Sequence, residues 1–334
     1  MDKNDRRALK DLAGQRLAEA TYSPRKLMLI HAGALLILSL TLALLDYLLE
    51  QQIGSTGGLG GIGSRSVLAT IQAVLRLAQA ALLPFWQMGY LFVAMKLARH
   101  EDISPWDLTE GFRRLGPVFR LNLLKTVITV FAAIASGYIS SMVFAMTPFA
   151  LPLLKVLESA ADESGIISDP AALQEALSAA TDEVFIPLMV IFLLVFLVIS
   201  VPLFYRYRLA SYFLLDSDEP RAIAAMRSSR KLMRYLCIDM FKLDASFWWF
   251  YALEALITAI GYGDLILSQL GFTIPIHADL ASFLFYFVYL VALLALNLWR
   301  KNHLEVTYAC TYDHLRSRHD PRPQPKPQNQ PWKY

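Results

Sequence analysis

Three ionisable residues lie inside long apolar stretches of this chain: His31, Arg76 and Glu254. An ionisable side chain is costly within hydrocarbon, so it needs either a partner or a role. Arg76 lies about ten residues from the outer start of the second stretch, and Glu254 lies about ten residues from the inner start of the fifth. Their depths allow a buried ion pair, which we interpret either as purely structural or as part of a polar pathway.

His31 lies only about one helical turn inside the first apolar stretch. At that depth a histidine can reach the lipid headgroups, and this is the simpler interpretation of the residue. We nevertheless keep His31 with Arg76 and Glu254 as a candidate intramembrane polar site.

A second group of candidates lies on a segment that we expect to be an amphipathic helix from about Pro220 to Leu236. Its basic face would suit anionic lipid headgroups, with the apolar face turned toward the membrane. The expected apolar face consists of Ala222, Met226, Ser229, Met233 and Leu236, and the basic face of Arg227, Arg230, Lys231 and Arg234.

The recognised catalytic, metal-binding and nucleotide-binding patterns are missing from the sequence. The segment 58–63 matches GxGxxG, but no strand precedes it, so we predict no nucleotide binding there. Cys237 and Cys310 form neither a CxxC pair nor a Cys/His cluster, and we expect both to be reduced. We therefore predict no cofactor, no metal site and no enzymatic activity.

Six apolar stretches must position these candidates, because each is long enough to cross a hydrocarbon core of about 30 Å as a helix. With 56% hydrophobic and 18% charged residues, the chain is more apolar than a typical soluble domain. We therefore predict an all-α bundle of about six membrane spans. These run over Leu27–Leu49, Val67–Leu97, Val118–Met146, Val184–Tyr205, Ala245–Leu267 and Leu280–Trp299.

The basic residues predict the orientation of the spans. Twenty-eight of the 31 Lys and Arg residues fall on alternate connections and on the two ends of the chain, including eight in the connection Arg206–Lys242. Short loops rich in Lys and Arg stay in the cytoplasm, so both termini are predicted to be cytoplasmic. A formal charge of +3 is too small for a nucleic-acid binder, and we expect anionic membrane lipids as partners instead.

The polar segments divide the chain into a cytoplasmic segment 1–26, a membrane domain 27–299 and a cytoplasmic segment 300–334. The last of these ends in a Pro-rich tail that we expect to be disordered. The third connection, 158–183, is acidic and is expected to be external, with a short helix over Ala171–Ala180. In the second connection, Ser104 and Asp107 have the spacing of a capping box and predict a helix start there.

Several segments resemble a bacterial family of multi-pass integral membrane proteins that is classed only as a domain of unknown function. The resemblance is carried by segment 5–10, by segment 208–216 (Arg-Leu-Ala-Ser-Tyr-Phe-Leu-Leu-Asp), by segments 228–233 and 242–247, and by segment 305–312. It implies a protein of the bacterial cytoplasmic membrane. It implies no reaction and no catalytic residues, because the family has no assigned activity.

Three function classes remain open from the sequence. The leading interpretation is a non-enzymatic membrane protein that is transport-associated, lipid-interacting or a scaffold. The alternative is a small-molecule or lipid permease with a polar route near Arg76 and Glu254, which a solvent-reachable cavity between spans two and five would favour. An intramembrane lipid-modifying enzyme is the third class, and the missing nucleophile–base or metal pattern disfavours it.

Overall fold

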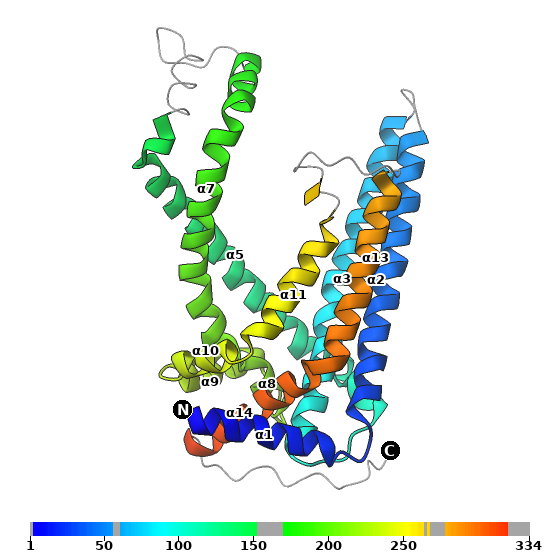
Figure 1. The fold of residues 1–334 in the computed structure, drawn as a ribbon, viewed down its shortest axis with the longest axis vertical. Helices are drawn as coiled ribbons and strands as arrows, with labels where there is room; N and C mark the ends of the chain where they lie inside the picture. Colours follow the sequence, from blue (N-terminus) through cyan, green and yellow to red (C-terminus); the bar gives the residue numbers. More distant parts are fainter. Residues whose placement is uncertain (1–2, 56–60, 152–169, 264–265, 268–277, 320–334) are drawn as a thin grey trace. The chain divides into compact units, whose positions relative to one another are not determined.

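The computed structural model describes residues 3–55, 61–151, 170–263, 266–267 and 278–319, and every element that it assigns there is helical. The prediction of an all-α bundle is confirmed (Figure 1). The Pro-rich tail, residues 158–169 of the acidic third connection and half of the segment 58–63 lie outside the described residues.

The helices are long where the sequence is apolar and short where it is polar. Two short 3-10 turns (η1 and η2) and one π-helical turn (η3) interrupt them. In chain order the elements are α1 (Lys3–Ala18), α2 (Pro24–Ser55), α3 (Gly61–Ala98), η1 (Pro105–Thr109), α4 (Glu110–Arg113), α5 (Leu115–Ala145), η2 (Pro148–Ala150), α7 (Pro170–Tyr207), α8 (Ala210–Leu215), α9 (Ala222–Met233), α10 (Cys237–Ala245), α11 (Trp248–Gly261), α13 (Ala278–Leu296), η3 (Asn297–Lys301) and α14 (Asn302–His319).

Five helical segments among the described residues are long and apolar enough to cross a membrane. Four of the six predicted spans correspond to α2, α3, α5 and α7, and a fifth corresponds to α13 with η3. The remaining one, predicted over Ala245–Leu267, differs from the structure. There α10 and α11 meet at an angle of 66°, and they make a sixth span only if the bent pair is taken as one segment.

The bend between α10 and α11 has a local cause. The N–H of Phe247 donates to the carbonyl of Asp244 over 2.8 Å, which closes a turn and ends α10. The Phe247 ring is buried, and the Lys10 ammonium lies 3.9 Å from its centroid. The chain is thus anchored at Phe247 before α11 begins, and the 14 residues of α11 extend about 21 Å, less than a hydrocarbon core.

The chain divides into two compact units, residues 122–208 and the rest. In the smaller unit, α7 is one continuous helix from Pro170 to Tyr207. We expected a separate short helix over Ala171–Ala180, but no proline or glycine between Ala180 and Val184 breaks the helix, so it runs on. Large apolar side chains of this unit are exposed, as on a lipid-facing surface, among them Phe131, Ile134, Leu194 and Val198.

In the larger unit, α3 packs against α2 and α14, and α11 packs against α13. Two glycines allow η1 and α4 to approach α3 at backbone distance. A Cβ atom at Gly89 would collide with the carbonyl oxygen of Leu108, and one at Gly111 would collide with that of Phe85. The predicted capping box starts η1, where the Ser104 N–H donates to Asp107 over 2.7 Å.

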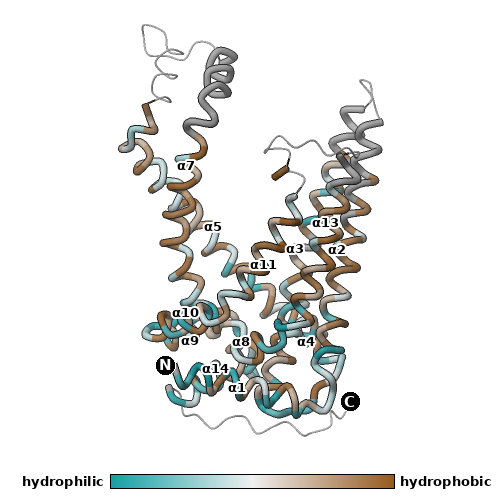
Figure 2. The backbone as a smooth tube through the Cα atoms, viewed as in Figure 1, coloured by the Kyte–Doolittle hydropathy of each residue, from teal (hydrophilic) through white to brown (hydrophobic). Residues whose placement is uncertain are grey.

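The short helices of the larger unit form a layer at one end of its spans, and Figure 2 shows that this layer is more hydrophilic than the spans. We call α1, η1, α4, α8, α9 and α14 the polar layer. Within it α14 packs on α1, and α9 packs on α8 and α14. Four of the five residues of the apolar face expected on α9 are buried there by protein, and Leu236, beyond the end of α9, is half-buried. This face therefore does not turn toward lipid as the sequence suggests, while the basic face is exposed.

Candidate functional site

A cavity of about 540 Å³ lies inside the larger unit, between α2, α3, α11 and α13 with η3. This volume is within the usual range of small-molecule sites. Apolar side chains of α2 and α13, such as Leu35, Leu36 and Leu293, form much of the wall. The polar lining residues are His31, Ser39, Gln87, Thr258, Tyr262, Tyr286, Tyr289, Asn297 and Lys301.

His31 is the most deeply buried polar residue of this lining, with 2% of its surface exposed. Its ring stacks on Tyr90 with centroids 4.6 Å apart and on Trp86 at 5.7 Å. The Trp86 indole N–H donates to the His31 carbonyl over 3.0 Å, so the backbone of α2 is tied to α3 at this point. The imidazole Nδ1 has no hydrogen-bond partner in the described part of the structure. A buried polar atom of this kind is costly and marks a place where a ligand or a water can bind.

Hydrogen bonds next to His31 join α2, α3 and α14. The Tyr90 hydroxyl donates to the Asn302 side-chain oxygen, and the Asn302 amide donates to the Pro24 carbonyl over 3.2 Å. Pro24 is the first residue of α2, and Asn302 is the first residue of α14. These contacts hold the starts of α2 and α14 against α3 beside the cavity.

The π-helical turn η3 supplies two polar groups to the cavity, the amide of Asn297 and the ammonium of Lys301. Single π turns often occur at functional sites, because they break the regular spacing of side chains along a helix. The lining therefore combines one half-buried cation, several neutral hydrogen-bonding groups and an apolar wall. Such a lining suits an amphipathic molecule with an anionic or hydrogen-bond-accepting group.

The three candidates of the predicted intramembrane site have different positions. His31 lines the cavity, Glu254 is half-buried on α11, and Arg76 is exposed on α3. Glu254 does not line the cavity itself, but its backbone carbonyl accepts from the Thr258 hydroxyl over 2.8 Å, and its charge acts on Tyr289; Thr258 and Tyr289 both line the cavity. The ion pair of Arg76 with Glu254 stays a prediction.

The candidate lipid contacts on α9 lie in the polar layer, away from the residues that line the cavity. Arg227, Arg230, Lys231 and Arg234 are all exposed. The Arg234 guanidinium lies 5.4 Å from the ring centroid of its neighbour Tyr235, which is 80% exposed. The side chains can therefore reach an anionic surface without any rearrangement of the helix.

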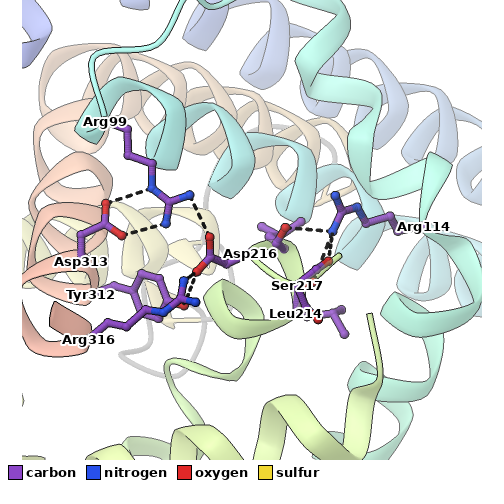
Figure 3. A network of polar contacts seen from close by, with 9 residues as sticks. Arg99, Arg114, Leu214, Asp216, Ser217, Tyr312, Asp313 and Arg316 are labelled. Atoms are coloured by element: carbon purple, nitrogen blue, oxygen red, sulfur yellow. Dashed lines mark hydrogen bonds and ion pairs between the residues drawn. The ribbon is translucent and has the colours of Figure 1, made fainter. Parts of the chain in front are cut away.

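A charged network in the polar layer was not predicted from the sequence (Figure 3). Arg99, just after α3, binds Asp313 through two hydrogen bonds of 3.1 and 2.8 Å, and its third nitrogen lies 2.8 Å from Asp216. Asp216 also contacts Arg316 and accepts from the Tyr312 hydroxyl over 3.0 Å. Burial lowers the pKa of Arg99, but hydrogen bonding to Asp313 and its charge more than offset this and raise the pKa overall.

Arg114 extends this network on its other side. Its guanidinium donates to the carbonyl of Leu215 over 2.8 Å and to that of Leu214 over 3.3 Å, which are the last carbonyls of α8. A cation at a helix C-terminus stabilises those unpaired carbonyls. Because every group in the network has a partner of opposite charge or a carbonyl, we interpret the network as structural.

Sequence reasoning missed Gln87, Asn297 and Lys301 as lining residues. Gln87 comes three residues after Pro84 within an apolar stretch, and Asn297 lies in the last predicted span. Neutral amides within such stretches are a usable signal, because an amide in hydrocarbon also needs partners. Lys301 follows the predicted span end and resembles an ordinary flanking lysine, so nothing in the sequence marks it.

Helices long enough to cross a membrane, together with a cavity between them, define the class of this chain: an all-α multi-pass membrane protein. Comparison of the chain with protein-family models, with curated proteins and with solved structures yields no match. The resemblance to a bacterial family of unknown function therefore stays a prediction. Among the described residues no group of three or more His, Cys, Asp or Glu side chains could hold a metal ion.

Proposed function

We propose that this protein is a non-enzymatic membrane protein that binds a lipid-like molecule in the cavity between α2, α3, α11 and α13. The observation that carries the proposal is the cavity itself, with His31, whose Nδ1 has no hydrogen-bond partner among the described residues, and the Lys301 ammonium in its lining. The acceptor group of the ligand would bind Lys301 and Asn297, and its apolar part would lie along Leu36 and Leu293.

The proposal includes no covalent step. The sequence has no nucleophile–base motif, and the cavity lining combines neutral hydrogen-bonding groups with a single lysine and a single histidine. Binding alone matches a transport-associated, lipid-interacting or scaffolding role in the bacterial cytoplasmic membrane, with both termini in the cytoplasm. Anionic lipids would contact the exposed basic face of α9 on that side.

A permease is the second candidate, and the position of Glu254 favours it. Glu254 lies one helical turn before Thr258, and its charge acts on Tyr289; both Thr258 and Tyr289 line the cavity, so a polar route could lead from the cavity past Glu254. Glu254→Gln would then reduce transport of a ligand but leave its binding in the cavity nearly unchanged. Equal transport by both forms in proteoliposomes would count against the route.

Binding of a fluorescent fatty acid tests the proposed function. A dansyl-labelled undecanoic acid becomes brighter in an apolar cavity, and we expect saturable binding by the purified protein in detergent. Ala32→Phe places a ring in the cavity, since Ala32 lines it, and should abolish this binding. Ala135→Phe makes the same change on an exposed position of α5 and serves as the control.

The charge of the ligand is tested at Lys301. Lys301→Gln should weaken binding of the anionic probe about tenfold, because a hydrogen bond to a charged group contributes about 1.5–3 kcal/mol. The corresponding dansyl alcohol should bind the wild type and the variant alike. If Ala32→Phe binds the acid as tightly as Ala135→Phe, the cavity is not the binding site.

A further inference from the structure

A second hollow, separate from the cavity, lies between α1 and α10 at the end of the spans that carries the polar layer. This cleft has a volume of about 430 Å³ and is lined by Arg6, Arg7, Lys10, Lys242, Ala245 and Ser246. Four of these six residues are basic, and none of the described lining residues is acidic. The cleft is therefore a region of high positive potential that attracts a multivalent anion.

Lys10 holds the inner wall of this cleft in place. Its ammonium donates to the Ser246 carbonyl over 3.1 Å and lies 3.9 Å from the centroid of the Phe247 ring. These contacts use part of its capacity of three donors, so at least one N–H can face a ligand. Partial burial and, as a smaller cause, the charge of the neighbouring Arg6 lower the pKa of Lys10.

The position of α10 is also fixed by hydrogen bonds. Asp244 accepts from the Tyr308 hydroxyl of α14 over 2.5 Å, and Tyr308 in turn contacts the Tyr251 hydroxyl at 2.7 Å. Lys242 therefore lies on a helix that is hydrogen-bonded to α14, and α14 is in turn hydrogen-bonded to α11. The cleft is a preformed site and needs no ordering of a loop.

The other side of α10 is apolar and exposed. Ile238, Phe241 and Ala245 recur at intervals of three and four residues along α10, so they share one face, and Trp248 is the first residue of α11 beyond the bend. The large side chains Ile238 and Phe241 of this face are 69% and 55% exposed, and Trp248 is 69% exposed. Since Ala245 belongs to this face and also lines the cleft, the apolar face and the basic cleft adjoin.

Aromatic residues near the cleft mark the level of a membrane interface. Trp249 and Trp299 pack with their ring centroids 5.6 Å apart, and the Arg300 guanidinium lies 5.0 Å from the Trp299 centroid. Tryptophans and arginines gather where headgroups meet acyl chains. Trp249 lies only three residues from Ser246 in the cleft, so the cleft opens at headgroup depth.

We propose that the cleft between α1 and α10 binds the phosphate headgroup of an anionic phospholipid, whose acyl chains lie against Phe241 and Trp248. The four cations hold the phosphodiester, and the exposed face of α10 covers the beginning of the chains. This site is independent of the ligand proposed for the cavity, and it uses a different set of residues from the basic face of α9. In this proposal α1 forms one side of a lipid-binding site.

Native mass spectrometry of the purified full-length protein in detergent tests this site. Phosphatidylglycerol and phosphatidylcholine with identical acyl chains are added in equal amounts, and bound lipids are counted. We expect the wild type to retain one phosphatidylglycerol in preference to phosphatidylcholine. The double variant Arg7→Gln/Lys242→Gln should bind it about 25-fold more weakly, about fivefold for each lost cation.

Three comparisons make the result specific. Arg227→Gln/Arg230→Gln removes the same charge from the basic face of α9 and should leave the tight lipid bound. Phe241→Ser should weaken binding of both lipids, because it removes apolar contact rather than charge. Both residues of the double variant Arg7→Gln/Lys242→Gln are exposed, so its thermal unfolding should match that of the wild type.

Two outcomes would overturn the proposal. If the α9 double variant loses the lipid as strongly as the α1–α10 variant, diffuse surface charge is responsible and the cleft is not a site. If inorganic phosphate displaces phosphatidylglycerol at equal concentration, the cleft binds a free anion and the acyl chains contribute nothing. Neither outcome changes the expected binding of the dansyl fatty acid, which reports on the cavity alone.

Discussion

The Tyr90 hydroxyl donates a hydrogen bond to the side chain of Asn302, a residue 212 positions later in the chain. Tyr90 also stacks on His31, and Asn302 holds the first residue of α2 through the Pro24 carbonyl. Through these two hydrogen bonds, Asn302 at the start of the last helix is linked to the second span and to the start of the first span. It lies beside His31, which lines the cavity.

Removal of the Tyr90 hydroxyl should destabilise the protein. Tyr90→Phe leaves the buried Asn302 oxygen without its donor, and an unsatisfied buried group costs about 1–3 kcal/mol. We expect a lower midpoint of thermal unfolding in detergent. Tyr235→Phe is the control, because Tyr235 is 80% exposed, and an equal shift in both variants would show that the Tyr90–Asn302 bond does not matter.

Neutralisation of Asp216 should have a larger effect. The Asp216 side chain is 2% exposed and contacts both Arg99 and Arg316, so Asp216→Asn leaves two half-buried cations with less compensation. Breaking a buried ion pair typically costs about 3–5 kcal/mol. Urea or thermal unfolding measures this, with Asp218→Asn as the control, since Asp218 is two residues away and exposed. Equal stability of the two variants would contradict a structural role for the network.

The close packing of α3 against η1 and α4 predicts that both Gly89→Ala and Gly111→Ala are poorly tolerated. In each case the new methyl group meets a backbone carbonyl, which cannot rotate away. Overpacking of this kind typically costs about 1–3 kcal/mol or more. Gly116→Ala on α5 has nothing within 4 Å of the added atom and should be neutral or slightly stabilising. Yield and thermal midpoint in detergent distinguish these outcomes.

The distribution of Lys and Arg predicts which connections face the cytoplasm. Cysteines introduced as Ala161→Cys and Ser217→Cys report on the third and fourth connections. A maleimide that cannot cross membranes should label the first variant in intact cells and the second only after permeabilisation. Labelling of Ser217→Cys in intact cells would reverse the predicted orientation. The native Cys237 and Cys310 lie on the predicted cytoplasmic side, so the background in intact cells should be low, and the wild type measures the background after permeabilisation.

The candidate site was only partly predictable from the sequence. His31 was identified by its position in an apolar stretch, and the structure places it in the lining of the cavity. Its partners Trp86 and Tyr90 were not identified, because aromatic residues at helical spacing are also typical of ordinary span interiors. Lys301 could not be found either, since a lysine at a span end is common and only its neighbours show that it faces a cavity.

The bend at Phe247 is a feature of the fold that the sequence likewise could not predict. The apolar stretch Ala245–Leu267 has the composition of a straight span, and hydropathy depends on composition alone. The structure ends α10 at Ala245 and starts α11 at Trp248, because Phe247 is buried against residues from α1 and α14. Those residues are distant from Phe247 in the chain, so no local sequence pattern predicts the bend.

The sequence by itself determined the class of this protein: long apolar stretches must become helices in a membrane, since hydrocarbon offers the backbone no other hydrogen-bond partners. It also determined which residues of α9 are apolar and which are basic, because helical periodicity is a local property. Only the tertiary structure decided what covers each face. Packing turned the apolar face of α9 toward α8 and α14, opened a cavity beside His31 and placed Arg7 beside Lys242, because these contacts join residues that are distant in the chain.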